Sequence, residues 1–446
     1  MVRMIFSSSK AVAAFLLTSV IIMSVLRSAE ALEIQQVTSP GGVKAWLVEE
    51  KSIPIISMEV IWKGGSVAVP KEKAGLAHLM ASTMDEGADE LDSEAFQKRL
   101  SDLAISLSFS ASKENFSGSL KTLSQNREEA FQLFSKAITD PRFDQEPVER
   151  IKGQILVSLN QKKSNPNSIA GRKWFEKAFE GNPLSIPSQG YMETLEMLTP
   201  ADLKEFKSRL IALDNIYISV VGDIDADTLG RLLDETFGKL PKENGVGKAL
   251  EMTAALPANP IVDVTDMTIP QSVVIFGGQG VKRDDPDYYA AYVLNYILGG
   301  GGFASRLNEE IREKRGLVYS VYSYLSPYRS VGLQLGGFGT SNKSVGEAIG
   351  LVKAEFQKIR ENGVTERELA AAKTYLNGSF PLRLSSNNKI ANIMVGMQLS
   401  ELEPSYLSKR ADLINAVTNE DIKRAALRLT DPEKMIITVV GQPEGL

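Results

Sequence analysis

The chain has 446 residues, of which 43% are hydrophobic and 24% are charged, so it can bury full cores in at least two domains and is not intrinsically disordered. Its net charge of −5 argues against a nucleic-acid-binding protein, which needs a basic face. Because it has no cysteine, disulfides and Cys-based zinc sites are excluded.

Residues 1–31 have the pattern of a signal peptide. Arg3 and Lys10 precede a mostly apolar run, and an Ala-Glu-Ala sequence that ends at Ala31 suits cleavage. The run is shorter than the roughly 20 residues that a bilayer span needs, so removal is favoured over a stable membrane anchor. We therefore expect an exported, periplasmic protein whose mature chain begins near Leu32.

Strands and long helices alternate after this segment. The β-branched residues of 53–62 predict a buried strand, and residues 104–123 alternate like a hairpin, with 105–112 as a candidate edge strand. Residues 127–138 and 147–163 have helical spacing. This mixture without a short βαβ period predicts an α+β fold.

Two pairs of sequences repeat at one offset. "TPADLK" at 199–204 is echoed by "TNEDIK" at 418–423, and "ISVVG" at 218–222 by "ITVVG" at 437–441. Each copy predicts a capped amphipathic helix followed by a strand that ends at glycine. The spacing is too long for a solenoid repeat and indicates a duplicated domain.

The duplication predicts two homologous tandem α+β domains, at residues 32–240 and 261–446. The Pro, Gly and Lys content of residues 241–260 is typical of a linker. The Gly-rich stretch 298–307 lacks the G-x-G-x-x-G order of a dinucleotide site, and we expect it to be a flexible turn.

The only histidine of the chain, His78, lies in the sequence H-L-M-A-S. On a helix, His78 and Ser82 would share one face. The inverted zincin pattern H-x-x-E-H places two zinc-binding histidines at these positions, with a glutamate between them that activates water. Here Ala81 stands in place of the glutamate, and Ser82 in place of the second histidine.

The segments "AGLAHLMASTMDEGA" at 74–88, "IREKRGLVYSVYS" at 311–323 and "VVGDID" at 220–225, together with the duplication, resemble the pitrilysin-like (M16) metallopeptidase family. The resemblance implies two related α+β domains that form half of a clamshell. It also places the third zinc ligand at or near Ser158, which is not acidic. It therefore implies no metal in this chain and a core role for His78.

The second half keeps Arg312 and Tyr319. In the resembled family an Arg and a Tyr at this spacing bind substrate beside the zinc, either from the second domain or from a partner subunit. A guanidinium and a phenol can donate to a peptide carbonyl and to the oxyanion formed when water attacks it. From spacing alone, Arg312 could instead pair with Glu309 or Glu313, and Tyr319 could simply pack in an alternating strand.

Three hypotheses follow. The first is a non-catalytic subunit that supplies Arg312 and Tyr319 in trans to a zinc-carrying M16-like partner, the heterodimer cleaving unfolded peptides held as an added strand. The second is an inactive peptide-binding or structural protein with no peptidase partner. The third is an independent peptidase that uses His78, Asp85 and Glu86 as ligands, although no general base stands beside them.

Overall fold

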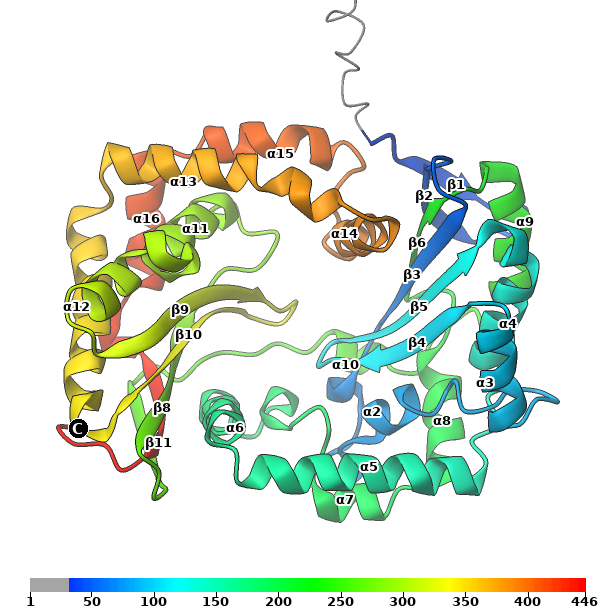
Figure 1. Ribbon diagram of the computed structural model, residues 1–446, viewed down its shortest axis with the longest axis horizontal. Helices are drawn as coiled ribbons and strands as arrows, with labels where there is room; N and C mark the ends of the chain where they lie inside the picture. Colours follow the sequence, from blue (N-terminus) through cyan, green and yellow to red (C-terminus); the bar gives the residue numbers. More distant parts are fainter. Residues whose placement is uncertain (1–31) are drawn as a thin grey trace, which may run out of the picture.

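The computed structural model describes residues 32–446, which fold into two α+β halves that lie side by side (Figure 1). The predicted signal peptide, residues 1–31, lies outside the described residues. Within residues 32–446, no helix is both long and apolar enough to cross a membrane.

The first half is built on a six-stranded sheet with the strand order β1-β2-β6-β3-β5-β4. Its strands are β1 (Gln35–Thr38), β2 (Lys44–Glu49), β3 (Ile55–Lys63), β4 (Ser106–Ala111), β5 (Asn115–Leu123) and β6 (Ile216–Gly222). β3 pairs antiparallel with both β5 and β6, and β2 runs parallel to β6. The predicted hairpin is therefore confirmed, and its first strand, β4, lies at an edge of the sheet as expected.

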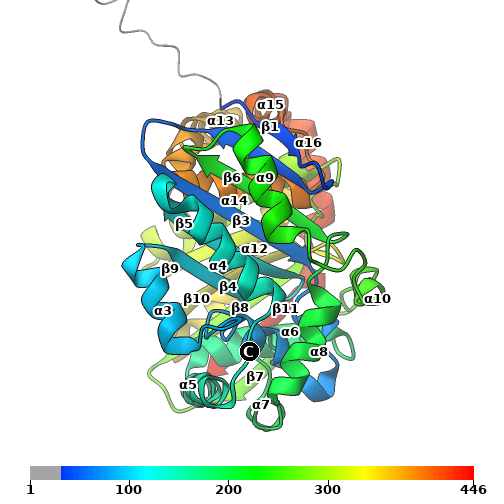
Figure 2. The same cartoon turned by 90° about the vertical axis from the view of Figure 1, so that its right-hand side faces the viewer.

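The helices of the first half are α2 (Leu76–Ala81), α3 (Ser93–Asp102), α4 (Arg127–Thr139), α5 (Gln145–Lys163), α6 (Pro166–Ala178), α7 (Met192–Glu196), α8 (Pro200–Leu210) and α9 (Ala226–Phe237). Figure 2 shows α4 and α9 in front of the strands, on the outer face of the first sheet. A short helix, α10 (Gly247–Leu250), lies within residues 241–260, and Val246 beside it is buried in the core of the first half.

The second half is built on a five-stranded sheet with the order β7-β11-β8-β10-β9. Its strands are β7 (Ile261–Asp266), β8 (Gln271–Gln279), β9 (Val318–Pro327), β10 (Gly332–Ser341) and β11 (Ile436–Gly441). Its helices are α11 (Tyr288–Asn295), α12 (Val345–Asn362), α13 (Glu366–Gly378), α14 (Asn387–Leu399), α15 (Tyr406–Asn415) and α16 (Asn419–Leu429).

The duplication is visible where each half ends. Thr199 and Thr418 cap α8 and α16 through the same reciprocal arrangement, in which the threonine hydroxyl and an aspartate three residues later each bond the other's backbone N–H. Each helix is followed by an interior strand of its sheet. This strand is β6, between β2 and β3, in the first half and β11, between β7 and β8, in the second, and each ends at a glycine with positive φ. The predicted fold class, two tandem α+β units, is confirmed.

Each half also places a helix on the sheet of the other half. α6 packs on β8 and β11, where the Trp174 indole donates to the carbonyl oxygen of Ile436 at 3.0 Å. α14 packs on β3 and β6, where the Gln398 amide donates to the carbonyl oxygen of Ile218 at 2.8 Å. This exchange, which Figure 1 shows between the two sheets, ties the halves together through buried contacts.

The expectation of a flexible turn at residues 298–307 is wrong. Residues 296–300 and 302–304 form π-helical and 3₁₀ turns, and Leu298 is fully buried. A Cβ on Gly299 would lie 2.5 Å from the hydroxyl of Ser323 on β9, so glycine lets the helical turn approach the strand closely. Gly299, Gly300 and Gly301 leave no room for a Cβ, whereas Gly302 faces open space with a φ of +57°.

Candidate functional site

His78 lies on α2, a helix of six residues that begins after Gly75. Gly75 has a φ of +100°, and a Cβ there would lie 2.8 Å from the carbonyl oxygen of Gln189, so only glycine suits this start. The same Gln189 reaches the histidine with its side chain, with Nε2 at 3.3 Å from His78 Nε2. Lys162 of α5 in turn donates to Gln189 Oε1.

This relay fixes the state of the imidazole. An amide nitrogen can only donate, so His78 Nε2 accepts from Gln189 and the ring proton lies on Nδ1. Burial lowers the pKa of His78, and the positive charge of Lys162 lowers it further. The lone pair that would bind a metal is thus occupied by Gln189, with an ammonium group beyond it.

The other positions of the zinc motif supply no ligands. Ala81 is buried, and the Ser82 hydroxyl donates to the His78 carbonyl oxygen at 3.0 Å, where it satisfies the helix end. Ser158 lies half-buried on α5, which packs against α2. In residues 32–446, no three His, Asp or Glu side chains converge as metal ligands would. This donor set does not fit zinc.

The carboxylates proposed for an independent peptidase are used otherwise. Glu86 accepts from Arg150 at 2.6 Å and from the Ser93 hydroxyl. Burial raises the pKa of Asp85 to about 6, which disfavours its charged form. Neither carboxylate joins His78 in a ligand cluster within residues 32–446, so the third hypothesis has no structural support.

Arg312 and Tyr319 do come together. Arg312 lies in a π-helical turn (Asn308–Glu313), and its guanidinium stacks on the rings of Tyr319, at 5.6 Å from the ring centre, and of Phe303, at 4.4 Å. It also pairs with Glu313 at 2.8 Å, one of the two partners considered from the sequence. Cation–π contacts and ion pairs of this kind are each typically worth about 1 kcal/mol or less, so the two rings and Glu313 together set the position of Arg312.

Both rings that hold Arg312 face solvent. Tyr319 is 88% exposed and Phe303 is 71% exposed, so the alternative that Tyr319 simply packs in the strand does not hold. On β9, Val318 and Val321 face the core instead, and Tyr319 projects outward. Sequence reasoning missed Phe303, for which the only signal was an aromatic residue directly after four glycines.

The two sets of residues lie in different halves of the chain. α2 belongs to the first half, and Arg312 with Tyr319 belongs to the second half, at the edge strand β9 (Figure 1). Arg312 and Tyr319 therefore lie apart from α2, where His78 is the only ligand of the zinc motif that remains.

Comparison with known proteins agrees with this reading of the residues. Residues 46–190 match the family model described as insulinase (peptidase family M16), and residues 197–376 match the peptidase M16 inactive domain. The chain is 29% identical to the non-peptidase homolog YmxG of Helicobacter pylori, over 83% of this chain and 84% of that protein. It is 24% identical to the uncharacterized zinc protease SCO5738 of Streptomyces coelicolor, over 92% and 89% of the two chains.

Among solved structures, the chain is similar to the peptidase M16 inactive domain from Pseudomonas fluorescens. The two share 30% sequence identity with a TM-score of 0.86, over 92% of this chain and 98% of that chain. The two family models together cover parts of both halves of the fold, and the chain belongs to the M16 peptidase family.

Proposed function

We propose that this chain is the non-catalytic subunit of a heterodimeric zinc metallopeptidase, and that it supplies Arg312 and Tyr319 to the zinc site of its partner. The observation that carries the proposal is the stack of Arg312 on the exposed rings of Phe303 and Tyr319, in a chain whose own zinc motif keeps only His78 of its ligands. The name of the Helicobacter pylori relative, a non-peptidase homolog, supports an inactive role for this chain alone.

The chemistry of the stack suits a peptide substrate. Arg312 stacks on two rings and pairs with Glu313, and Tyr319 is exposed beside it. Both can donate to a carbonyl oxygen that gains negative charge when water attacks. Zinc held by the partner would supply the activated water, and this chain would position the peptide and stabilise the oxyanion.

Exposure of the two rings also supports a partner subunit. Exposed aromatic and arginine side chains are enriched at the centres of protein interfaces, and Phe303 and Tyr319 are uncovered in the isolated chain. We propose that an M16-like subunit with an intact H-x-x-E-H helix covers them, so that two chains with two domains each enclose the substrate.

The test is reconstitution. Tagged, processed chain is used to isolate a stoichiometric partner from periplasmic extract, and each chain is then purified alone and mixed. We expect the partner to carry H-x-x-E-H and bound zinc, and only the mixture to cleave an unfolded peptide. Cleavage by the partner alone at the same rate, or a partner without the motif, would replace this function with a peptide-binding or structural role.

A further inference from the structure

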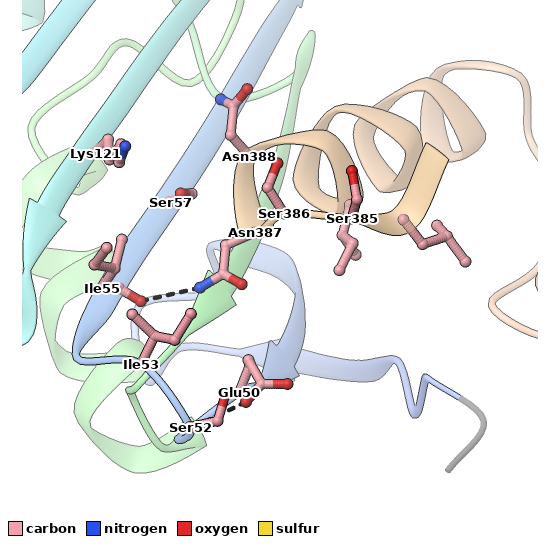
Figure 3. A pocket seen from close by; sticks show the side chains of 12 residues that line it. Glu50, Ser52, Ile53, Ile55, Ser57, Lys121, Ser385, Ser386, Asn387 and Asn388 are labelled. Atoms are coloured by element: carbon pink, nitrogen blue, oxygen red, sulfur yellow. Dashed lines mark hydrogen bonds between the residues drawn. The ribbon is translucent and has the colours of Figure 1, made fainter. Parts of the chain in front are cut away.

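A cavity of about 320 Å³ lies where the halves meet, at the first turn of α14 (Figure 3). β3 and its neighbour β5 form the floor through Ile55, Ser57 and Lys121. The segment 384–388 forms one wall, and the loop 50–53 forms the rim. Its volume is in the range of small-ligand sites. None of the residues discussed for zinc or for the oxyanion lines it.

The buried hydroxyl of Ser57 is the first feature that points to a ligand in this cavity. The residue is only 1% exposed, and its Oγ has no hydrogen-bond partner among the residues that the structure describes. Along β3, Ser57 alternates with core residues and lies on the same face of the strand as Glu59. Helix α14 covers this face, and the Asn388 amide of α14 donates to Glu59. A buried hydroxyl without a partner is costly, so a polar group in the cavity would stabilise it.

Cationic groups lie near Ser57, and burial raises the pKa of the neighbouring Glu59, which disfavours its charged form. Lys121 is exposed and stands directly across from Ser57 in the β3–β5 register. The first turn of α14, a helix of thirteen residues, lines the same space, where the Ser386 side chain accepts from the Lys389 N–H, and the positive end of the helix dipole favours an anion. Lys389 adds a second ammonium, which donates to the Ser385 hydroxyl at 3.0 Å.

The opposite side of the cavity is negative. Glu50 accepts from the Ser52 backbone N–H at 2.8 Å, and the hydrogen bonds from the Ser52 side chain and backbone lower the pKa of Glu50. This carboxylate is therefore charged at neutral pH. Figure 3 shows Lys121 and Glu50 at opposite ends, with Ile53 and Ile55 between them. Ile53 is 52% exposed, although it is a large apolar side chain.

We propose that this cavity binds a short peptide with free termini. Its carboxylate would lie among Ser57, Lys121 and the first turn of α14, and its ammonium group beside Glu50. An apolar side chain would cover Ile53 and Ile55. The site goes beyond the proposed function, because it needs neither zinc nor a partner subunit.

Calorimetric titration of the processed chain alone with dileucine tests the charge pattern. We expect binding of dileucine, and affinity weaker by about tenfold or more for dileucine amide, which lacks the carboxylate. Lys121→Ala should cause a similar loss, whereas Lys98→Ala, which removes an exposed lysine of α3, should bind like wild type. Equal affinity for acid and amide, or no binding at millimolar dileucine, would overturn the proposal.

The Ser57→Ala variant separates an effect on dileucine binding from an effect on folding. Because it removes a hydroxyl without a partner, its free energy of unfolding should be equal to or higher than that of wild type, while dileucine binds several-fold more weakly. Unchanged dileucine affinity in this variant would show that the peptide carboxylate does not bind at Ser57 and would overturn the proposal. Because no partner is present, failure here leaves the peptidase proposal untouched, and failure of reconstitution leaves this site untouched.

Discussion

At the residue scale, the zinc motif has been replaced by a hydrogen-bond relay rather than left vacant. Gln189 donates to the one imidazole, and Lys162 donates to Gln189. Each group that could bind or activate a metal-bound water is either absent, as at Ala81, or engaged, as at Ser82. The cationic end of the relay also opposes a second positive charge at His78.

Because His78 is the only histidine in the sequence, the pKa of its imidazole can be measured without overlap from other histidines. We predict that the imidazole of His78 titrates below its ordinary value of 6.5, because burial and Lys162 both disfavour the imidazolium. Lys162→Met should raise that pKa, with the chemical shift of the ring followed by NMR as the measurement. A titration above 6.5 in wild type would contradict the relay.

The same shift has a consequence for stability. The unfolded chain would protonate His78 near 6.5, whereas the folded chain protonates it at lower pH. The unfolded state therefore binds more protons in this window, and stability falls as pH drops from 6.5 through the folded pKa. His78→Gln should flatten that part of the curve of unfolding free energy against pH; an unchanged slope would speak against the assignment.

At the scale of elements, local patterns predicted local structure well. The helix caps at Thr199 and Thr418 and the hairpin before Leu123 depend on neighbours within a few residues, and all three are present. Which sheet a helix covers depends on contacts far apart in the sequence. Nothing within α6 indicates that Trp174 meets Ile436 of the other half.

The candidate site was predictable only in part. Arg312 and Tyr319 were singled out by the family resemblance, because their spacing alone fits an ordinary ion pair and a strand aromatic equally well. The contact of Arg312 with Phe303 joins two separate turns and follows no spacing rule. The cavity at Ser57 needs strands and a helix from both halves, so no single segment could reveal it.

Because α6 packs on the sheet of the second half, we expect the loss of its buried Trp174 to destabilise the fold strongly. Trp174→Ala should lower the free energy of unfolding by about 3–5 kcal/mol, because it leaves a cavity and removes the bond to the Ile436 carbonyl. Val157→Ala on α5, where the side chain is 59% exposed, serves as the control and should have little effect. Urea denaturation gives both values, and a loss below about 1 kcal/mol at Trp174 would refute the anchoring role.

At the scale of the whole molecule, the tips of two hairpins join the halves. Glu114, between β4 and β5, is buried and accepts from the backbone N–H of Arg329 at 2.7 Å and from the Ser330 hydroxyl at 2.8 Å. The Arg329 guanidinium returns a bond to the Glu114 carbonyl oxygen at 2.6 Å. With α6 and α14, this contact fixes how the halves face each other.

Glu114→Ala should loosen this junction. We expect a loss of about 3–5 kcal/mol in the free energy of unfolding, because Arg329 is left without its carboxylate in a partly buried position. Hydrogen exchange should be faster at the amides of Arg329 and Ser330, which donate to Glu114. Glu180→Ala, which alters an exposed residue, is the control. Unchanged exchange at both amides in Glu114→Ala would show that Glu114 does not hold the two hairpin tips together.

Peptide cleavage by the proposed heterodimer, reconstituted with Arg312→Ala in this chain, is the decisive measurement of whether this chain contributes to catalysis. We expect kcat to fall by about 10²–10³ with an unchanged amount of complex, because the oxyanion loses one donor. Arg315→Ala, which alters a neighbouring exposed arginine, should leave kcat near wild type. Wild-type turnover with Arg312→Ala in an intact complex would contradict a catalytic contribution from this chain.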